Sequence, residues 1–142
     1  MQIEDIELCF SHAEGTPIMG RALVDSLRNR IKKAKKEIIL CSCEFTPDSG
    51  FILIEEIKRQ LAHNRKVTVY GNPSPKLTKL AHKEDLDGLR VFEWKPPREK
   101  SLFHIKAITI DDQWIYIGSA NLSYNAMNNS AEWGVIGNSP DL

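Results

Sequence analysis

The chain has 142 residues, 42% of them hydrophobic, which is the usual size of a single domain with one sizeable core. Its 19 basic and 19 acidic residues balance, and this excludes a global electrostatic attraction to nucleic acid or to an anionic membrane. An anionic ligand must therefore be bound by a local arrangement of charges.

The N-terminal sequence MQIEDIELCF carries acids where a secretory signal has a basic start and an apolar core. No run approaches the ~18 apolar residues of a membrane span. We therefore expect a cytoplasmic protein without stable membrane association.

The first half of the chain alternates strand and helix signals. A strand is predicted over residues 3–10. A helix is predicted over 20–36, because apolar residues recur at helical spacing and cations crowd its last turns, where they suit the helix dipole. The run EIILCSC at 37–43 is nearly continuously apolar, as in a strand buried on both faces of a sheet. The apolar positions of the helix are Leu23, Leu27, Ile31 and Ala34.

The second half continues the alternation and ends in β-like runs. Apolar residues form one helical stripe after Gly50, and the run KVTVYG then alternates and is rich in β-branched residues. The predicted elements are a helix over 50–64, a strand over 66–71, a short helix over 77–81, and strands over 89–94, 103–111, 113–118 and 132–136. The alternation predicts one α/β domain over residues 1–142, with a mixed β-sheet flanked by helices on both faces.

The three cysteines, Cys9, Cys41 and Cys43, form neither a disulfide framework nor a C-x-x-C pair. Cys41 and Cys43 are two residues apart on a predicted strand, so their side chains point the same way. Because free cysteine is among the most frequently buried residue types, we expect both to lie in the core.

The strand predicted over 103–111 opens with a histidine and a lysine two residues apart. Residues two apart share one face of a strand, so His104 and Lys106 project together. An unpaired lysine is costly to bury, which indicates that the pair meets a ligand. Taken alone, H-x-K is more typical of the solvated polar end of an edge strand.

The residues that follow extend the pair into a longer pattern of fixed spacing. Its members are His104, Lys106, Asp111, Gly118, Ser119, Asn121 and Glu132. All but the last resemble the HKD motif of the phospholipase D superfamily, H-x-K-x4-D-x6-G-S-x-N, at every defined position. The stretches ELCFS, RIKKAKKEIILCSCEFT and IEEIKRQLAHNRKVTVYG are similar to the opening strand and the first two β-α units of that family. The resemblance therefore covers nearly the whole chain as one half-unit of the fold.

The same residues suit attack on a phosphodiester. Such a site must neutralise the charge on the non-bridging oxygens, supply a nucleophile and protonate the leaving oxygen. A neutral imidazole at His104 can be the nucleophile, with Lys106 as a fixed cation beside it. The Ser119 hydroxyl and the Asn121 amide offer hydrogen bonds to the phosphoryl oxygens. Gly118 has no Cβ and lets the backbone approach a phosphate closely.

Two carboxylates complete the expected set of catalytic residues. A catalytic imidazole needs an acceptor for its second ring nitrogen, and the resemblance assigns this role to Glu132. Strict alternation places Asp111 on the face opposite His104. We expect Asp111 to support the site from the turn, by tying down the adjoining loop or by pairing near Lys106.

The pattern contains no spacing typical of a metal site, because the four histidines are scattered and the carboxylates are not arranged as a two-metal clamp. The resemblance likewise implies a mechanism without a metal or other cofactor, through a phosphohistidine intermediate. We expect His12, His63 and His82 to be ordinary surface or capping residues.

The chain carries one HKD motif, whereas the family mechanism uses two histidines, one to attack and one to protonate the leaving group. Two interpretations stay open. Either two copies form a homodimer with the active site on the two-fold axis, or the chain is a piece of a longer protein that holds the second motif. The C-terminal GNSPDL is similar to the start of a helix that follows the last strand in the family, which favours a truncated or excised domain.

The motif recognises only the phosphodiester group, which nucleic acids and phospholipids share. The lack of amphipathic membrane-binding stretches favours a nuclease over a phospholipid hydrolase or transferase. Cations and aromatic residues before the motif either line a groove for a nucleic-acid backbone or are merely solvated. They are Lys95, Arg98 and Lys100, with Trp94 and Phe103. A further alternative keeps the fold and the phosphate pocket but uses them only to bind nucleic acid or to assemble a larger complex.

Overall fold

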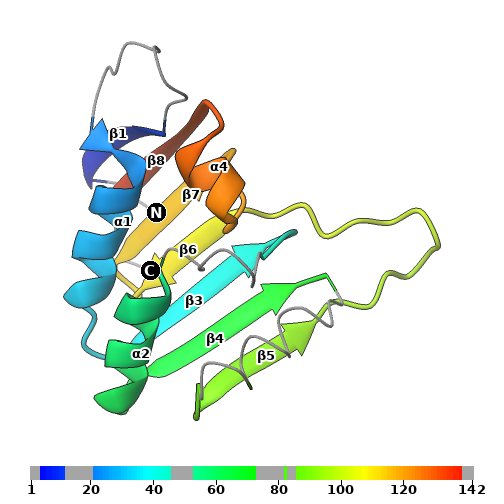
Figure 1. The fold of residues 1–142 in the computed structure, drawn as a ribbon, viewed down its shortest axis with the longest axis horizontal. Helices are drawn as coiled ribbons and strands as arrows, with labels where there is room; N and C mark the ends of the chain where they lie inside the picture. Colours follow the sequence, from blue (N-terminus) through cyan, green and yellow to red (C-terminus); the bar gives the residue numbers. More distant parts are fainter. Residues whose placement is uncertain (1–3, 12–20, 46–52, 73–81, 83–85, 139–142) are drawn as a thin grey trace.

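The computed structural model describes residues 4–11, 21–45, 53–72, 82 and 86–138. Within these residues eight strands form one mixed sheet, in the order β2-β1-β8-β7-β6-β3-β4-β5 (Figure 1). The strands are β1 Glu4–Ser11, β2 Arg21–Ala22, β3 Glu37–Ser42, β4 Lys66–Gly71, β5 Leu89–Glu93, β6 Ala107–Ile110, β7 Trp114–Gly118 and β8 Glu132–Asn138. The helices are α1 Leu23–Lys32, α2 Ile54–Ala62 and α4 Tyr124–Asn128. The prediction of an α/β domain with a mixed sheet is confirmed.

Most predicted elements are present with somewhat different bounds. The helix predicted over 20–36 ends at Lys32, because the next N–H groups turn to other partners, including the carboxylate of Asp111. The helix predicted over 77–81 lies outside the described residues. The sequence patterns do not predict β2 and α4, which have two and five residues and are too short to show a period.

The pairing of the strands places the ends of β3, β4 and β7 and the start of β6 at the same end of the sheet. β3, β4 and β5 are parallel, and β6 is antiparallel to both β3 and β7. Ala107, the first residue of β6, therefore lies between Cys41 near the end of β3 and Ile117 near the end of β7. The segments that leave β3, β4 and β7 meet the segment that enters β6.

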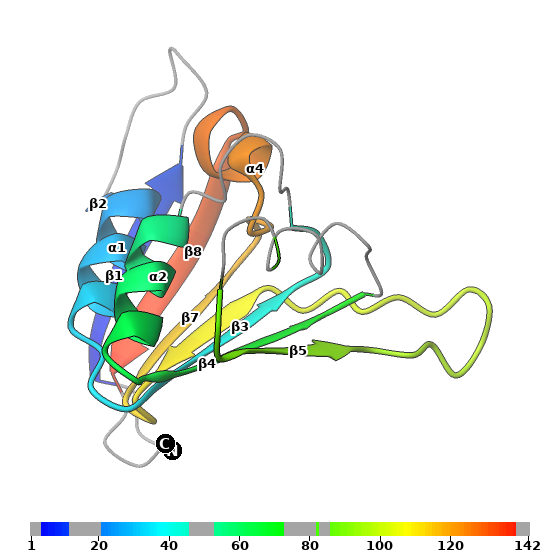
Figure 2. The ribbon, with the colours of Figure 1, turned by 60° about the horizontal axis from the view of Figure 1, so that its bottom comes forward.

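The hydrophobic core lies between the sheet and the two longer helices, α1 and α2, which cover one face (Figure 2). Alternate strand residues point into this core because side chains of a strand alternate between faces. Fully or nearly fully buried examples are Ile38 and Leu40 of β3, Val67 and Val69 of β4, and Ile108 and Ile110 of β6. Leu23, Leu27 and Ile31 of α1 meet them, so the predicted apolar stripe of this helix is confirmed.

The other face of the sheet is open in the described part of the chain. The strand positions on this face carry large apolar side chains that are 37–65% exposed. They are Ile6, Leu8, Tyr70, Phe92, Ile117 and Trp133. The described long helices thus lie on one face only, whereas the sequence predicts helices on both.

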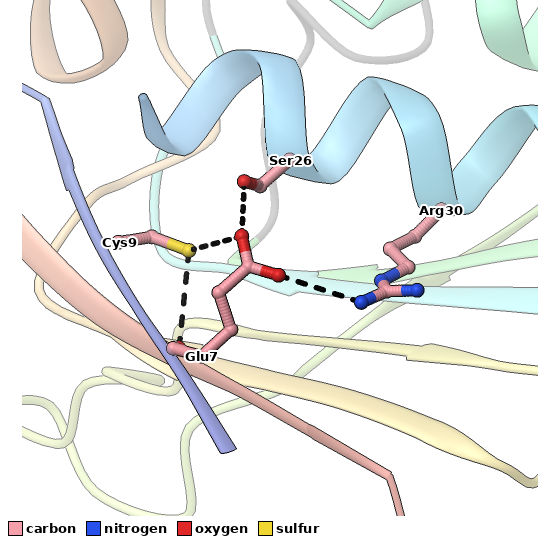
Figure 3. A network of polar contacts seen from close by, with 4 residues as sticks. All are labelled: Glu7, Cys9, Ser26 and Arg30. Atoms are coloured by element: carbon pink, nitrogen blue, oxygen red, sulfur yellow. Dashed lines mark hydrogen bonds and ion pairs between the residues drawn. The ribbon is translucent and has the colours of Figure 1, made fainter. Parts of the chain in front are cut away.

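A cluster of polar side chains joins β1 to α1 on the face of the sheet that the helices cover (Figure 3). The Glu7 carboxylate accepts hydrogen bonds from Ser26 Oγ at 2.6 Å, from Arg30 at 3.4 Å and from Cys9 Sγ at 3.5 Å. The Arg30 guanidinium also lies 3.7 Å from the centroid of the Trp114 ring. The half-buried charges of Glu7 and Arg30 therefore compensate each other where the helix crosses the strand.

Tyr116 packs over two paired glycines, Gly118 at the end of β7 and Gly134 near the start of β8. A Cβ atom added at Gly118 or at Gly134 would overlap the Tyr116 side chain. Burial raises the pKa of Tyr116 far above its ordinary value; the backbone of Ala120 opposes this shift and the charge of Glu132 adds to it. Gly118 is therefore required by the packing of a buried ring, a reason that differs from the close phosphate approach expected from the sequence.

Candidate functional site

His104 and Lys106 lie side by side at this end of the sheet, as predicted, but they precede a strand. β6 begins at Ala107, so a segment without regular secondary structure carries both residues and the strand start predicted at 103 is wrong. Lys106 Nζ lies 3.1 Å from His104 Nε2. It also lies 3.4 Å from Nδ1 of the same ring, so the ammonium stands beside both ring nitrogens. His104 is exposed and Lys106 is half-buried, which leaves the ring open to a ligand.

Asn72, the first residue after β4, holds the segment that carries His104. Its amide nitrogen donates to the carbonyl oxygens of Cys43 and Phe103, both at 3.2 Å. Its amide oxygen accepts from the Phe103 N–H at 3.1 Å. Since Phe103 directly precedes His104, these bonds fix the backbone next to the imidazole and tie it to the segment after β3.

The serine after β7 is bonded to the start of β8. The Ser119 hydroxyl donates to a carboxylate oxygen of Glu132 and accepts from the Trp133 N–H at 3.1 Å. The N–H of Gly118 donates to the carbonyl oxygen of Lys106 at 3.3 Å. The residue before Ser119 is therefore bonded to the backbone of the histidine–lysine segment, while Ser119 itself is bonded to β8.

Glu132 does not contact the imidazole in this arrangement. Within the described residues no hydrogen bond joins Glu132 to His104, and the carboxylate accepts from Ser119 instead. The reason is topological, because Glu132 opens β8 and β7 lies between β8 and β6. The structure brings Glu132 to the site through Ser119, where the sequence predicts direct contact with His104.

Asn121 faces the segment that leaves β3. Its side-chain oxygen accepts from the Cys43 thiol at 2.8 Å, and its nitrogen donates to the Glu44 carboxylate at 3.4 Å. Cys43 lies just beyond β3 and is half-buried, as is Cys41, so the prediction that both lie in the core is wrong. Partial burial raises the pKa of the Cys41 thiol.

Ser42 links the segments after β3 and after β7. Its buried hydroxyl accepts from the Leu122 N–H at 3.0 Å and donates to the Glu44 carbonyl oxygen at 2.8 Å. Phe45 and Leu122 then form a parallel bridge. These bonds hold the two segments side by side.

Asp111 lies at the opposite end of β6 from His104. Its carboxylate accepts three backbone hydrogen bonds that join the β6–β7 turn to the loop before β3. The donors are the N–H groups of Lys35, Lys36 and Glu37, at 2.6, 2.7 and 3.0 Å. The bonds confirm that Asp111 ties down the adjoining loop, and they place it away from Lys106 and from the other catalytic candidates.

The remaining histidines contribute no group to this arrangement. His63 follows α2 and its Nδ1 lies 2.7 Å from the Arg59 carbonyl oxygen, as expected for a capping residue. His82 is exposed, and His12 lies outside the described residues.

In the described ranges no group of three or more His, Cys, Asp or Glu side chains could hold a metal ion. No helix in the part of the chain that is described has the length and apolarity needed to cross a membrane.

The sequence analysis misses two residues that shape the site, Ser42 and Asn72. Each is a polar residue at the C-terminal end of a strongly apolar strand. That position is a usable signal, because a strand that stops leaves backbone groups in need of partners.

Residues 27–142 match the family described as "Cardiolipin synthase, PLD-like domain". None of the curated proteins is a significant match.

Several solved structures share the fold at low sequence identity. NucT from Helicobacter pylori has a TM-score of 0.67 and 22% identity, over 82% of this chain and 77% of that one. Nuc from Salmonella typhimurium, a phospholipase D family member, has a TM-score of 0.67 and 19% identity, over 96% of this chain and 84% of that one. A phosphatidylserine synthase from Haemophilus influenzae has a TM-score of 0.74 and 17% identity, over 95% of this chain but 35% of the synthase. At these identities the likeness shows the fold.

Asp111→Ala should destabilise the protein by about 2 kcal/mol, because three N–H groups lose a charged acceptor. Asp111 also has a φ of 57°, which alanine tolerates less well than aspartate. Asp111→Asn keeps that tolerance and one acceptor oxygen, so it should be affected less. Urea unfolding measures the difference; equal stability of wild type and Asp111→Ala would show that the turn does not depend on this carboxylate.

Proposed function

The chain belongs to the phospholipase D superfamily as a PLD-like domain, and from this premise we propose that it is a metal-independent phosphodiesterase that cleaves nucleic acid. The observation that carries the proposal is that the Lys106 ammonium stands beside the exposed His104 ring, 3.1 Å from Nε2 and 3.4 Å from Nδ1. A neutral imidazole carries a lone pair on one ring nitrogen, which is what attack on phosphorus requires. The ammonium beside it can neutralise a phosphoryl oxygen as charge develops.

The proposed reaction has two displacements at phosphorus. A ring nitrogen of His104 attacks, the P–N bond forms, and the bond to the leaving oxygen breaks as a second imidazolium gives that oxygen its proton. Water then attacks the phosphohistidine and gives its proton to the second imidazole, and the P–N bond breaks to release His104. Protons and charge balance over the cycle, and no metal is needed.

The second imidazole is proposed to be His104 of another copy of this chain. A two-fold axis through the site places identical residues on opposite sides of one phosphate, which is the arrangement that an attack and a protonation require. The exposed position of His104 at the end of the sheet suits such sharing.

Ser119 and Asn121 are proposed to donate to the phosphoryl oxygens. The Asn121 amide donates over a long 3.4 Å bond to Glu44, which a phosphate can replace at little cost. The Ser119 hydroxyl must turn from Glu132 to reach a phosphate. Glu132 then lacks this donor, and its carboxylate can accept a hydrogen bond from another group at the site.

His104→Ala should abolish cleavage of a plasmid and of a single-stranded oligonucleotide in the presence of a chelator, because the nucleophile is lost. Lys106→Ala should lower turnover by about 100-fold, as expected for one donor that stabilises a developing oxyanion. Circular dichroism checks that both variants fold. Wild-type activity that disappears in the chelator and returns with a divalent ion would contradict the mechanism, and wild-type cleavage of phospholipid alone would contradict the substrate class.

Adding an excess of His104→Ala chains to the wild type should lower the activity per wild-type chain, since mixed dimers hold one imidazole where two are needed. The readout is turnover against mixing ratio after equilibration, with light scattering to report the mass. Full activity from a strict monomer would contradict the shared site.

A further inference from the structure

Residues 94–103 form an arm that projects from the body of the molecule and leads from β5 to the segment with His104 (Figures 1 and 2). No described helix or strand covers it in either view. The arm is the yellow-green loop in Figure 1. Its place directly before the candidate nucleophile makes it a candidate for contact with the rest of a long substrate.

The root of the arm is fixed to the sheet. The Trp94 N–H donates to the carbonyl oxygen of Gly71 at 2.8 Å, and the Trp94 and Phe103 rings pack with their centroids 6.2 Å apart. Asn72 binds the backbone of Phe103 on the same side. The two aromatic rings therefore pack against each other at the root of the arm.

The outer part of the arm is stiff and cationic. Pro96 and Pro97 restrict the backbone, and a turn forms where the Ser101 N–H donates to the Arg98 carbonyl oxygen at 3.0 Å. The exposed charged side chains are Lys95, Arg98 and Lys100 against Glu99, which is three positive charges and one negative. No ion pair within the described residues involves them. The arm is thus a local positive feature on a chain with a formal net charge of zero.

We propose that this arm binds the phosphates of a nucleic-acid strand that flank the phosphate attacked at His104; the inference rests on the proposed function. Lys100 precedes His104 by four residues, and an extended chain spans about 3.5 Å per residue, so the Cα atoms of the two residues lie within about 14 Å of each other. That reach covers the neighbouring nucleotides of a strand held at the imidazole. Exposed, unpaired cations contribute to such binding by releasing counterions from the backbone.

The composition of the arm favours a nucleic acid over a membrane surface. Loops that bind membranes combine cations with several apolar side chains that enter the lipid. In the arm the two aromatic rings pack on each other. Apart from the two prolines, the arm has one aliphatic residue, Leu102, which is 74% exposed. A phosphate backbone needs the cations alone.

The test compares two triple variants of the full chain that each lose three positive charges. The arm variant is Lys95→Ala, Arg98→Ala and Lys100→Ala. The control variant is Lys33→Ala, Lys35→Ala and Lys36→Ala, whose exposed side chains lie at the Asp111 end of the molecule. Binding of a fluorescent single-stranded deoxyoligonucleotide of about 20 nucleotides is measured by anisotropy over a salt series, with His104→Ala added to both variants and to the reference so that none cleaves.

The arm variant should bind at least 10-fold more weakly at low salt, and its slope of log affinity against log salt should fall by about 2, as expected for three lost contacts to a single strand. The control variant should stay within about twofold of the reference. Equal losses in both variants, or none in the arm variant, would overturn the proposal. The proposal would also be overturned if the reference, but not the arm variant, bound vesicles of anionic phospholipid while neither bound the oligonucleotide.

Hydrolysis of bis(p-nitrophenyl) phosphate separates this inference from the function on which it rests. That small diester has no flanking phosphates, so with His104 present the arm variant should lose at least 10-fold more activity on the oligonucleotide than on the small diester. Equal losses on both substrates would mean that the arm shapes the site and does not bind flanking phosphates. A wild type that hydrolyses neither substrate would contradict the proposed function, while the binding measurement would still decide the role of the arm.

Discussion

The candidate site depends on how the backbone is satisfied where the strands stop. A strand that ends leaves N–H and C=O groups without partners in the sheet, and here polar side chains supply those partners. Ser42 accepts from Leu122 after β7, and Asn72 binds both backbone groups of Phe103 before β6. Each side chain bridges segments that are far apart in the sequence. The bonds that satisfy the backbone therefore also assemble the group of residues around His104.

The two ends of β6 have different tasks. At one end the Asp111 carboxylate accepts hydrogen bonds from three N–H groups of the segment that leads into β3. These bonds fix the register of β6 against β3. At the other end the chain leaves the strand with Lys106 beside His104. A shift of one residue in this register would turn every side chain to the other face of the sheet. Asp111 is thus a positioning residue that acts on the site through the strand between them.

The sequence predicts the alternation of elements and the meeting of His104 with Lys106, because both follow from short-range periodicity. It misplaces the start of β6, since the point where a strand stops depends on which neighbours still offer partners. It also misses the contact between Glu132 and Ser119, because that contact follows from the order of strands in the sheet and not from spacing along the chain. Cys43 illustrates the same limit: its thiol meets Asn121 across 78 positions of sequence, a distance over which periodicity carries no information.

The stereochemical course at phosphorus tests most directly the central claim that His104 attacks the phosphodiester. Two successive in-line displacements, by imidazole and then by water, each invert the phosphorus centre. A phosphorothioate diester of known configuration, cleaved in isotopically labelled water, should therefore give a product with retained configuration. Inversion would mean that water attacks the diester directly, and it would contradict a phosphohistidine on the reaction path.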